Sequence, residues 1–303
     1  MATLKGQNFR ILTKTGAANF QCVGMATNCT VTLTGNTDDA STKDDLGGAQ
    51  KPTITSKSWS VSVESLSVAD VATMLAAIKN GTKFTLLWDE VATTDNQTPQ
   101  AAGFARQGEA YLNDVTFNFN DRENATKSLQ FTGTGALSTI SEAPTITTLS
   151  AGSYTKGQFV RLFLGSDNTA TPNKVIAAAK SLSFHVSTTL EDATTKDTTD
   201  DWQVQEVTGI AFDISSNALV RSGDTITSSV AAQDLAAIES IYEASTPVKF
   251  VIANTSGANN RTKGTAIVSG SVIVTQLTLN GPNRQNATYD TTLTGYGDYT
   301  VGA

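Results

Sequence analysis

The stretch SWSVSVES, residues 58–65, alternates apolar and polar side chains over most of its length. In an extended strand, successive side chains point to opposite faces, so the Trp and Val residues share one face. Ser60, Ser62 and Glu64 share the other. The pattern predicts a β-strand with one buried and one polar face, and it sets the expectation of a mainly β fold.

A second alternating stretch, VTFNFN at 115–120, places Asn118 and Asn120 on its polar face. Neither stretch contains Lys or Pro, the residues with which proteins commonly block the exposed edge of a sheet. An unblocked edge can pair with another chain. We therefore expect neighbouring subunits to complete these sheets.

Two segments show helical spacing instead. In residues 67–81, Ser67 is a predicted N-cap with Asp70 in the first turn, and Gly81 lies just beyond the end. Residues 229–245 repeat the apolar stripe, with Pro247 behind it. Each segment predicts one helix flanking a sheet, and hence an α+β arrangement of antiparallel sandwich or barrel type.

The two halves of the chain resemble each other in four blocks that keep their order. KGQNFRIL (5–12) matches KGQFVRLF (156–163), DASTKD (39–44) matches DATTKD (192–197), TKFTLLW (82–88) matches PVKFVIA (247–253) with Lys83-Phe84 on Lys249-Phe250, and RENATKSLQFTGTG (122–135) matches RQNATYDTTLTGYG (284–297). Chance similarity between Thr-rich stretches would not preserve this order. The sequence predicts a tandem duplication, with units at 1–140 and 155–303 and a linker at about 138–154.

Composition disfavours several classes of protein. The 303 residues carry 28 acidic and 21 basic side chains, for a net charge of −7, and no run of Lys and Arg forms a phosphate-binding stripe. The N-terminus lacks the apolar core of a secretory signal, and no apolar stretch is long enough to span a membrane. We expect a soluble protein without a membrane segment.

Cysteines and histidine offer little chemistry. Cys22 and Cys29 fall where the second copy has Val175 and Leu182, which predicts buried, inert thiols. His185, the single histidine, corresponds to Thr32, so we expect a solvent-facing strand residue instead of a catalytic base.

The acidic loop DDASTKDDLGG, residues 38–48, does not follow the alternate-ligand pattern of a calcium loop. We expect no metal, no cofactor and no catalytic residue, and hence no enzyme. A pair of distant carboxylates acting as a hydrolase remains open, since any two acids can meet in a fold.

The order of KGxxxRIL, TVTLTG, DDASTKDD and KSWSVSVESL, followed by a short helix, resembles the major tail tube protein of long-tailed bacteriophages. The resemblance covers residues 5–135 and, more loosely, 156–297. It implies β-sandwich units of tail-tube type with one flanking helix. It further implies that six units form a ring around a channel and that stacked rings form a tube for double-stranded DNA.

Two units per chain then predict trimeric rings with pseudo-sixfold symmetry. The implied partners are further copies of the chain, together with tail terminator, tape measure and distal tail or baseplate proteins. DNA would pass without specific binding. The implied place is the phage tail of the virion, after synthesis in the cytoplasm of the bacterial host.

The resemblance also assigns site residues. Residues of the repeated loop would contact the next ring: Asp38, Asp39, Thr42, Lys43, Asp44, Asp192, Thr195, Lys196 and Asp197. Polar strand residues would face the lumen: Ser60, Ser62, Glu64, Asn118 and Asn120. Two other readings stay open, namely the inner tube of a contractile tail or injection system and a two-domain β-sandwich binding or adhesion module.

Overall fold

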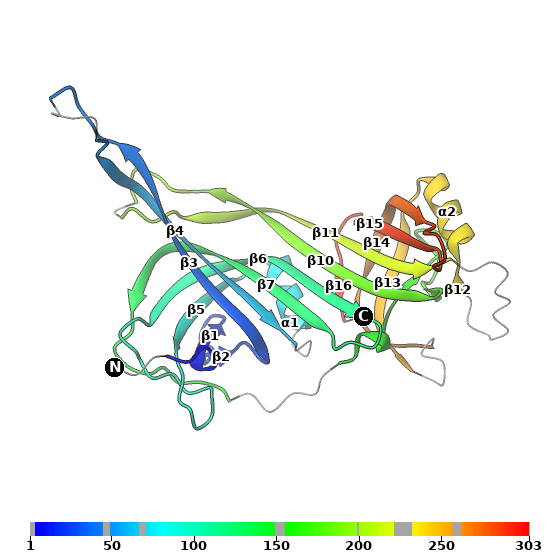
Figure 1. The fold of residues 1–303 in the computed structure, drawn as a ribbon, viewed down its shortest axis with the longest axis horizontal. Coiled ribbons are helices and arrows are strands. Elements are labelled where there is room, and N and C mark those ends of the chain that lie inside the picture. The colour runs from blue at the N-terminus through cyan, green and yellow to red at the C-terminus, as the bar shows by residue number, and fades with distance from the viewer. Residues whose placement is uncertain are drawn as a thin grey trace.

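The computed structural model describes residues 4–44, 49–66, 71–148, 155–198, 200–220, 232–256 and 262–302. Within these residues the chain is built mainly from antiparallel strands, with two α-helices (Figure 1). The mainly β fold predicted from strand alternation is confirmed.

The first half contains seven strands, one α-helix and a short 3-10 helix. In chain order these are η1 (Gly6–Asn8), β1 (Phe9–Lys14), β2 (Gln21–Cys22), β3 (Ala26–Asp39), β4 (Pro52–Ser65), α1 (Val71–Lys79), β5 (Lys83–Glu90), β6 (Arg106–Asn120) and β7 (Thr126–Thr139).

The second half repeats this succession and adds two short strands. Its elements are η2 (Gly157–Phe159), β8 (Val160–Leu164), β9 (Lys174–Ile176), β10 (Ala179–Asp192), β11 (Gln205–Leu219), β12 (Ala232–Gln233), α2 (Leu235–Ala244), β13 (Val248–Ser256), β14 (Thr262–Asn280), β15 (Thr288–Gly295) and β16 (Thr300–Val301).

Hydrogen bonding orders the strands in the same way in both halves. The first half reads β2-β1-β5-β6-β7-β4-β3, and the second reads β9-β8-β13-β14-β15-β11-β10. The register repeats as well. Pairing shifts by one residue between Leu112 and Asp114 of β6, and it shifts again between Val274 and Gln276 of β14. Such bulges are specific local features, so their recurrence ties each strand to its counterpart.

One of the four sequence blocks is misaligned. Phe84 pairs with Ala110, and at the same place in the second half Val248 pairs with Val272. Phe84 therefore corresponds to Val248, two residues before Phe250, which was its predicted match. Because side chains alternate along a strand, a shift of two keeps them on the same face, and the hydrophobic pattern could not reveal it.

The two halves join edge to edge through β6 and β10. The start of β6 pairs with β5, from Arg106 to Tyr111, whereas its end pairs with β10, from Asp114 to Asn120. One strand thus belongs to both halves. In Figure 1 the sheet runs without a break from β7 and β6 into β10 and β11.

The hydrophobic core is continuous across this joint. One cluster of buried side chains includes Phe117 of β6 and Phe184 of β10, which lie opposite each other. Helix α1 contributes Leu75, whose backbone oxygen accepts a hydrogen bond of 2.7 Å from the Tyr299 hydroxyl of the second half. The halves are therefore packed together as well as paired.

Both predicted helices are present. Helix α1 is described from Val71, so the predicted cap by Ser67 and Asp70 lies outside the described residues. Helix α2 begins after Asp234, whose carboxylate accepts a hydrogen bond of 3.0 Å from the Ala237 amide. This arrangement satisfies one of the free amides at the helix start.

Candidate assembly surfaces

The polar face of the long sheet carries all five residues predicted to face a lumen. Residues directly opposite each other in antiparallel strands point the same way. Ser62 of β4 lies opposite Gln130, which lies opposite Asp114 of β6. Ser60 and Glu64 lie two residues from Ser62 on β4, and Asn118 and Asn120 lie four and six residues from Asp114 on β6. Even spacing along a strand places side chains on the same face. The structure therefore brings the predicted set onto one face, with every member at least partly exposed.

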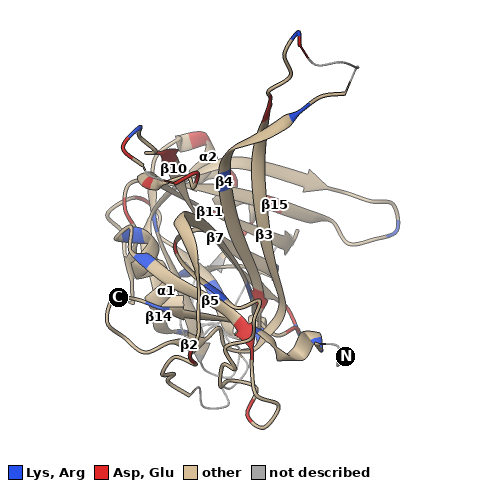
Figure 2. Cartoon of the chain, turned by 90° about the vertical axis from the view of Figure 1, so that its left-hand side faces the viewer, with Lys and Arg blue, Asp and Glu red and all other residues tan. Residues whose placement is uncertain are grey.

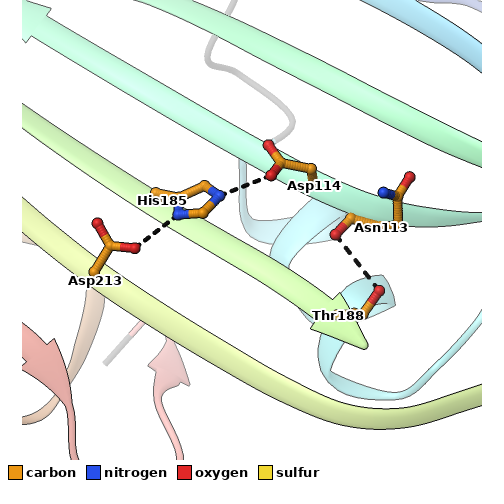
Figure 3. A network of polar contacts seen from close by, with 5 residues as sticks. All are labelled: Asn113, Asp114, His185, Thr188 and Asp213. Atoms are coloured by element: carbon orange, nitrogen blue, oxygen red, sulfur yellow. Dashed lines mark hydrogen bonds and ion pairs between the residues drawn. The ribbon is translucent and has the colours of Figure 1, made fainter. Parts of the chain in front are cut away.

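His185 occupies the middle of this face at the joint between the halves (Figure 3). Its Nε2 lies 2.8 Å from Oδ2 of Asp114 on β6, and its Nδ1 lies 2.7 Å from Oδ1 of Asp213 on β11. Nearby, the Thr188 hydroxyl donates to the Asn113 carbonyl at 3.5 Å. The imidazole is about one-third exposed, so the prediction of a merely solvent-facing histidine is corrected: it bridges three strands.

The carboxylates decide the charge of this histidine. Partial burial by itself lowers the pKa of His185, but the hydrogen bonds to Asp114 and Asp213 and their negative charges outweigh it and raise the pKa. The sequence could not predict this cluster. Asp114 and Asp213 lie far from His185 along the chain, and only the strand register brings them beside it.

The repeated Asp-Ala-Ser/Thr motif closes the loop that connects the two strands of each long hairpin. Oδ1 of Asp39 accepts hydrogen bonds from the Ser41 amide at 2.9 Å and the Ser41 hydroxyl at 2.5 Å. The same oxygen of Asp192 binds the Thr194 amide, at 2.9 Å, and the Thr194 hydroxyl. In turn, Oγ of Ser41 accepts from the Lys51 amide at 3.0 Å.

These contacts give the repetition a structural reason. Hydrogen bonds from the Ser41 and Thr194 hydroxyls lower the pKa values of Asp39 and Asp192, because they favour the ionised carboxylates. Asp and a hydroxyl residue two positions later form this turn through local side-chain bonds. Asp39 and Asp192, predicted to contact the next ring, thus hold their own loops closed.

The other predicted contact residues are exposed. Asp38 lies near the end of β3. The rest lie in the loops at the hairpin tips: Thr42, Lys43, Asp44, Thr195, Lys196 and Asp197. The β3–β4 hairpin projects far from the rest of the molecule in Figure 1, and Figure 2 shows acidic and basic residues together near its tip. The structure leaves these side chains accessible to another molecule.

Part of the loop between β10 and β11 contacts the first half of the same chain. Lys57 of β4 forms an ion pair of 3.1 Å with Asp201, and its backbone pairs with the same segment through the Asp201 oxygen and the Gln203 amide. The Gln203 oxygen accepts from the Gly135 amide at 2.8 Å. The returning segment of the β10–β11 loop therefore docks on the first half, a contact that the repeat alone did not indicate.

The cysteines fit their predicted role in part. Cys22 is buried, and burial raises the pKa of its thiol to about 11. Cys29 is only partly buried, although burial also raises its pKa. Across the described part of the chain, no three His, Cys, Asp or Glu side chains gather as metal ligands. Neither described helix has the length and apolar character needed to cross a bilayer.

Comparison with known proteins finds a similarity in the first half of the chain. Residues 3–139 match the family model described as phage tail tube protein. The first half of the chain is thus similar to phage tail tube proteins. This match supports a structural role in a phage tail tube. No curated protein matches the chain.

Solved structures of tail proteins are also similar. The tail of an empty gene transfer agent particle, computed with helical refinement in C6 symmetry, shows 16% identity and a TM-score of 0.35, covering 48% of this chain and 95% of that one. The virion of a native gene transfer agent shows 17% identity and a TM-score of 0.34, covering 49% of this chain and 99% of that one. The SPP1 tail tube, a hybrid structure from solid-state NMR and cryo-EM, shows 16% identity and a TM-score of 0.33, covering 48% of this chain and 78% of that one.

Proposed function

We propose that the chain is a structural virion protein without catalytic activity, which polymerises as stacked rings into a phage tail tube that conducts double-stranded DNA into the host. Each ring contains three chains. One observation carries the proposal: within one chain, two units of the same strand order already lie side by side in a continuous sheet. Repeating that step around an axis extends the sheet, and a repeated rotation that closes gives a ring.

The tandem organisation sets the number of chains. We assign one unit to residues 1–140 and the other to residues 155–303, because each half supplies a complete copy of the strand order. Six units around an axis then require three chains, with pseudo-sixfold symmetry. The partners are other copies, and terminator, tape measure and distal tail or baseplate proteins at the tube ends.

The polar face of the long sheet lines the channel in this proposal. Besides Ser60, Ser62, Asn118 and Asn120 it presents the acids Glu64, Asp114, Asp213 and Asp290. Lys and Arg side chains would hold DNA phosphates and release their counterions. An acidic and neutral wall repels the phosphates, so DNA slides past without being retained.

The exposed hairpin tips provide the contacts between rings. Charged residues at these tips, such as Lys43 and Lys196, can pair with a neighbouring ring without disturbing their own loops, which are closed separately by Asp39 and Asp192. Both tips carry the same motif and can make the same contact twice per chain.

Electron microscopy of the purified full chain tests this function. At rising protein concentration we expect hollow filaments, and native mass spectrometry of the smallest closed species should give three chains. A protein that stays monomeric at high concentration would favour a binding module, whereas a closed ring with another number of chains would overturn the trimer alone.

A further inference from the structure

Among the strand edges that lack a partner in the part of the chain that the structure describes, those of β3 and of the end of β14 belong to long strands. Strand β3 pairs only with β4, although its counterpart β10 pairs on both sides. The end of β14, from Gln276 to Asn280, pairs only with β15, although the matching end of β6 also pairs with β10. The two open edges are therefore the counterparts of the two edges joined inside the chain.

The side chains on these edges differ in burial from their counterparts. Leu33 of β3 is 61% exposed, whereas Val186, at its place in β10, is fully buried. Leu279 of β14 is 54% exposed, whereas Phe117, at its place in β6, is 1% exposed. Large apolar side chains on an open strand edge mark a pairing site for another strand.

We propose that β3 of one copy pairs antiparallel with residues Gln276–Asn280 of β14 in the next copy, in the register that β10 and β6 use within the chain. Val186 lies opposite Val115 and Phe184 lies opposite Phe117 in that joint. The corresponding pairs between copies are Leu33 with Leu277 and Val31 with Leu279. The inference rests on the self-assembly proposed above and adds the strands, direction and register.

The repeated Lys-Gly segment supports the same contact independently. A Cβ on Gly157 would lie 2.3 Å from the Asn120 carbonyl oxygen, so only glycine fits where the second half meets the first. The Gly157 amide also donates to the Glu123 oxygen at 2.8 Å. At Gly6, its counterpart in KGQ, nothing lies within 4 Å.

Position 6 is therefore a glycine although nothing around it within the chain requires one. The hairpin that binds Gly157 joins β6 to β7, and its counterpart joins β14 to β15 at residues 281–287. Residues 281–286 are exposed. Placing β3 on the β14 edge of the next copy brings Gly6 against that hairpin, which accounts for its lack of a side chain.

Contacts made by β4 and β7 support the same junction. Lys57 and Thr134 of the first half receive the segment that follows the β10 hairpin. Their counterparts Ile210 and Tyr296 are 41% and 52% exposed. In the proposed junction Ile210 receives Ala49 and Gln50 of the next copy. Pro52, the counterpart of Gln205, lies beside Tyr296 and, having no amide hydrogen, does not repeat the hydrogen bond made to Thr134.

Disulfide cross-linking tests the register. In a full chain carrying Cys22→Val and Cys29→Ala, we would introduce Leu33→Cys and Leu277→Cys, since directly opposed antiparallel residues lie within disulfide range. Under oxidation we expect dimers and trimers on a non-reducing gel. The matched control combines Leu33→Cys with Thr278→Cys, whose side chains point to opposite faces and should not link.

The outcomes separate the junction from the function. Filaments without the Leu33–Leu277 cross-link, or with equal linking in the control, overturn the pairing and leave the tube proposal standing. Cross-linked oligomers without filaments support the pairing and overturn the tube. Monomers without cross-links overturn both.

A glycine substitution gives a second test. Gly6→Ala should leave the thermal unfolding of the monomer unchanged, because a Cβ there meets nothing, yet raise the concentration needed for assembly at least tenfold. Gly103→Ala, also in open space but away from the junction, should assemble normally. Unchanged assembly of the Gly6 variant would contradict the proposed contact.

Discussion

The indole ring of Trp59 occupies the place where Gly133 would carry a side chain. A Cβ on Gly133 would lie 2.1 Å from Cε2 of Trp59, and in the second half a Cβ on Gly295 would lie 2.5 Å from the Phe212 ring. Both glycines belong to the repeated Thr-Gly-x-Gly ending. The first glycine of the motif is therefore needed in each half because a large aromatic ring from the neighbouring strand occupies the space, whereas the second, Gly135 or Gly297, has a positive φ that favours glycine.

Gly133→Ala should consequently destabilise the protein. Inserting a methyl group into a packed core costs about 1–3 kcal/mol, because the ring must move or adopt a strained rotamer. Urea unfolding followed by tryptophan fluorescence would measure the change. Gly103→Ala, with nothing within 4 Å, is the control. Equal stability of the two variants would show that Trp59 adjusts freely.

Asp89 should be needed to hold the segment after β5. Its side chain is buried and accepts hydrogen bonds from the amides of Glu90 at 2.7 Å, Ala101 at 2.7 Å and Ala102 at 3.0 Å. Asp89→Ala leaves these amides without their acceptor and should cost about 1–3 kcal/mol or more in the free energy of unfolding.

The control for this change is Asp95→Ala. Asp95 also accepts amide hydrogen bonds, from Gln97 and Thr98, but it is exposed and water can replace it. Denaturant titration should show a clearly smaller loss for Asp95→Ala. A loss as large as that of Asp89→Ala would place the effect in the loop conformation instead of in burial.

The cluster of His185, Asp114 and Asp213 should make stability depend on pH. The pKa of His185 is raised in the folded protein, so its stabilisation is complete below the unfolded pKa of about 6.5 and is lost as pH rises through the folded pKa. Since all three groups are partly solvated, we expect a loss of about 0.5–1 kcal/mol.

Thermal melts of the parent chain and of His185→Thr at several pH values would measure this effect. Threonine is the residue at the matching position of the first half, Thr32, and has no charge to lose. The difference between the two chains should shrink as pH rises. A difference that stays constant across that range would assign His185 a packing role only.

Reversing charge at both hairpin tips should weaken the stacking of rings. Lys43→Glu together with Lys196→Glu replaces two exposed cations, and exposed charges contribute little to folding but can oppose a docked partner. We expect shorter filaments by electron microscopy and unchanged melting. The charge-preserving pair Lys43→Arg and Lys196→Arg should stack normally. Filaments of normal length from the glutamate variant would exclude these tips from the stacking contact.

Strand faces and helices could be predicted from the sequence because they depend on local periodicity. The alternation in SWSVSVES correctly predicted that Trp59 is buried and that Ser62 faces outward. The repeat of DASTKD and DATTKD was also visible, but its role in closing each hairpin through Asp39 and Asp192 was not.

Contacts set by strand register could not be predicted in this way. The bridge from His185 to Asp114 and Asp213 and the docking of Asp201 on Lys57 join residues distant in sequence. A two-residue error at Phe84 likewise leaves the hydrophobic pattern intact. Local periodicity fixes the face of a side chain, and only the assembled sheet fixes its neighbours.

The joint between β6 and β10 has a consequence for how such a protein evolves. In a homohexamer of single units, one substitution changes all six seams at once, and it must suit every one of them. Here the seam within the chain carries His185, Asp114 and Asp213, where the matching positions hold Thr32, Gln276 and Ser60. In the proposed assembly, two units in one chain release each kind of seam from the other, so selection can strengthen one while leaving the other easy to form and reversible.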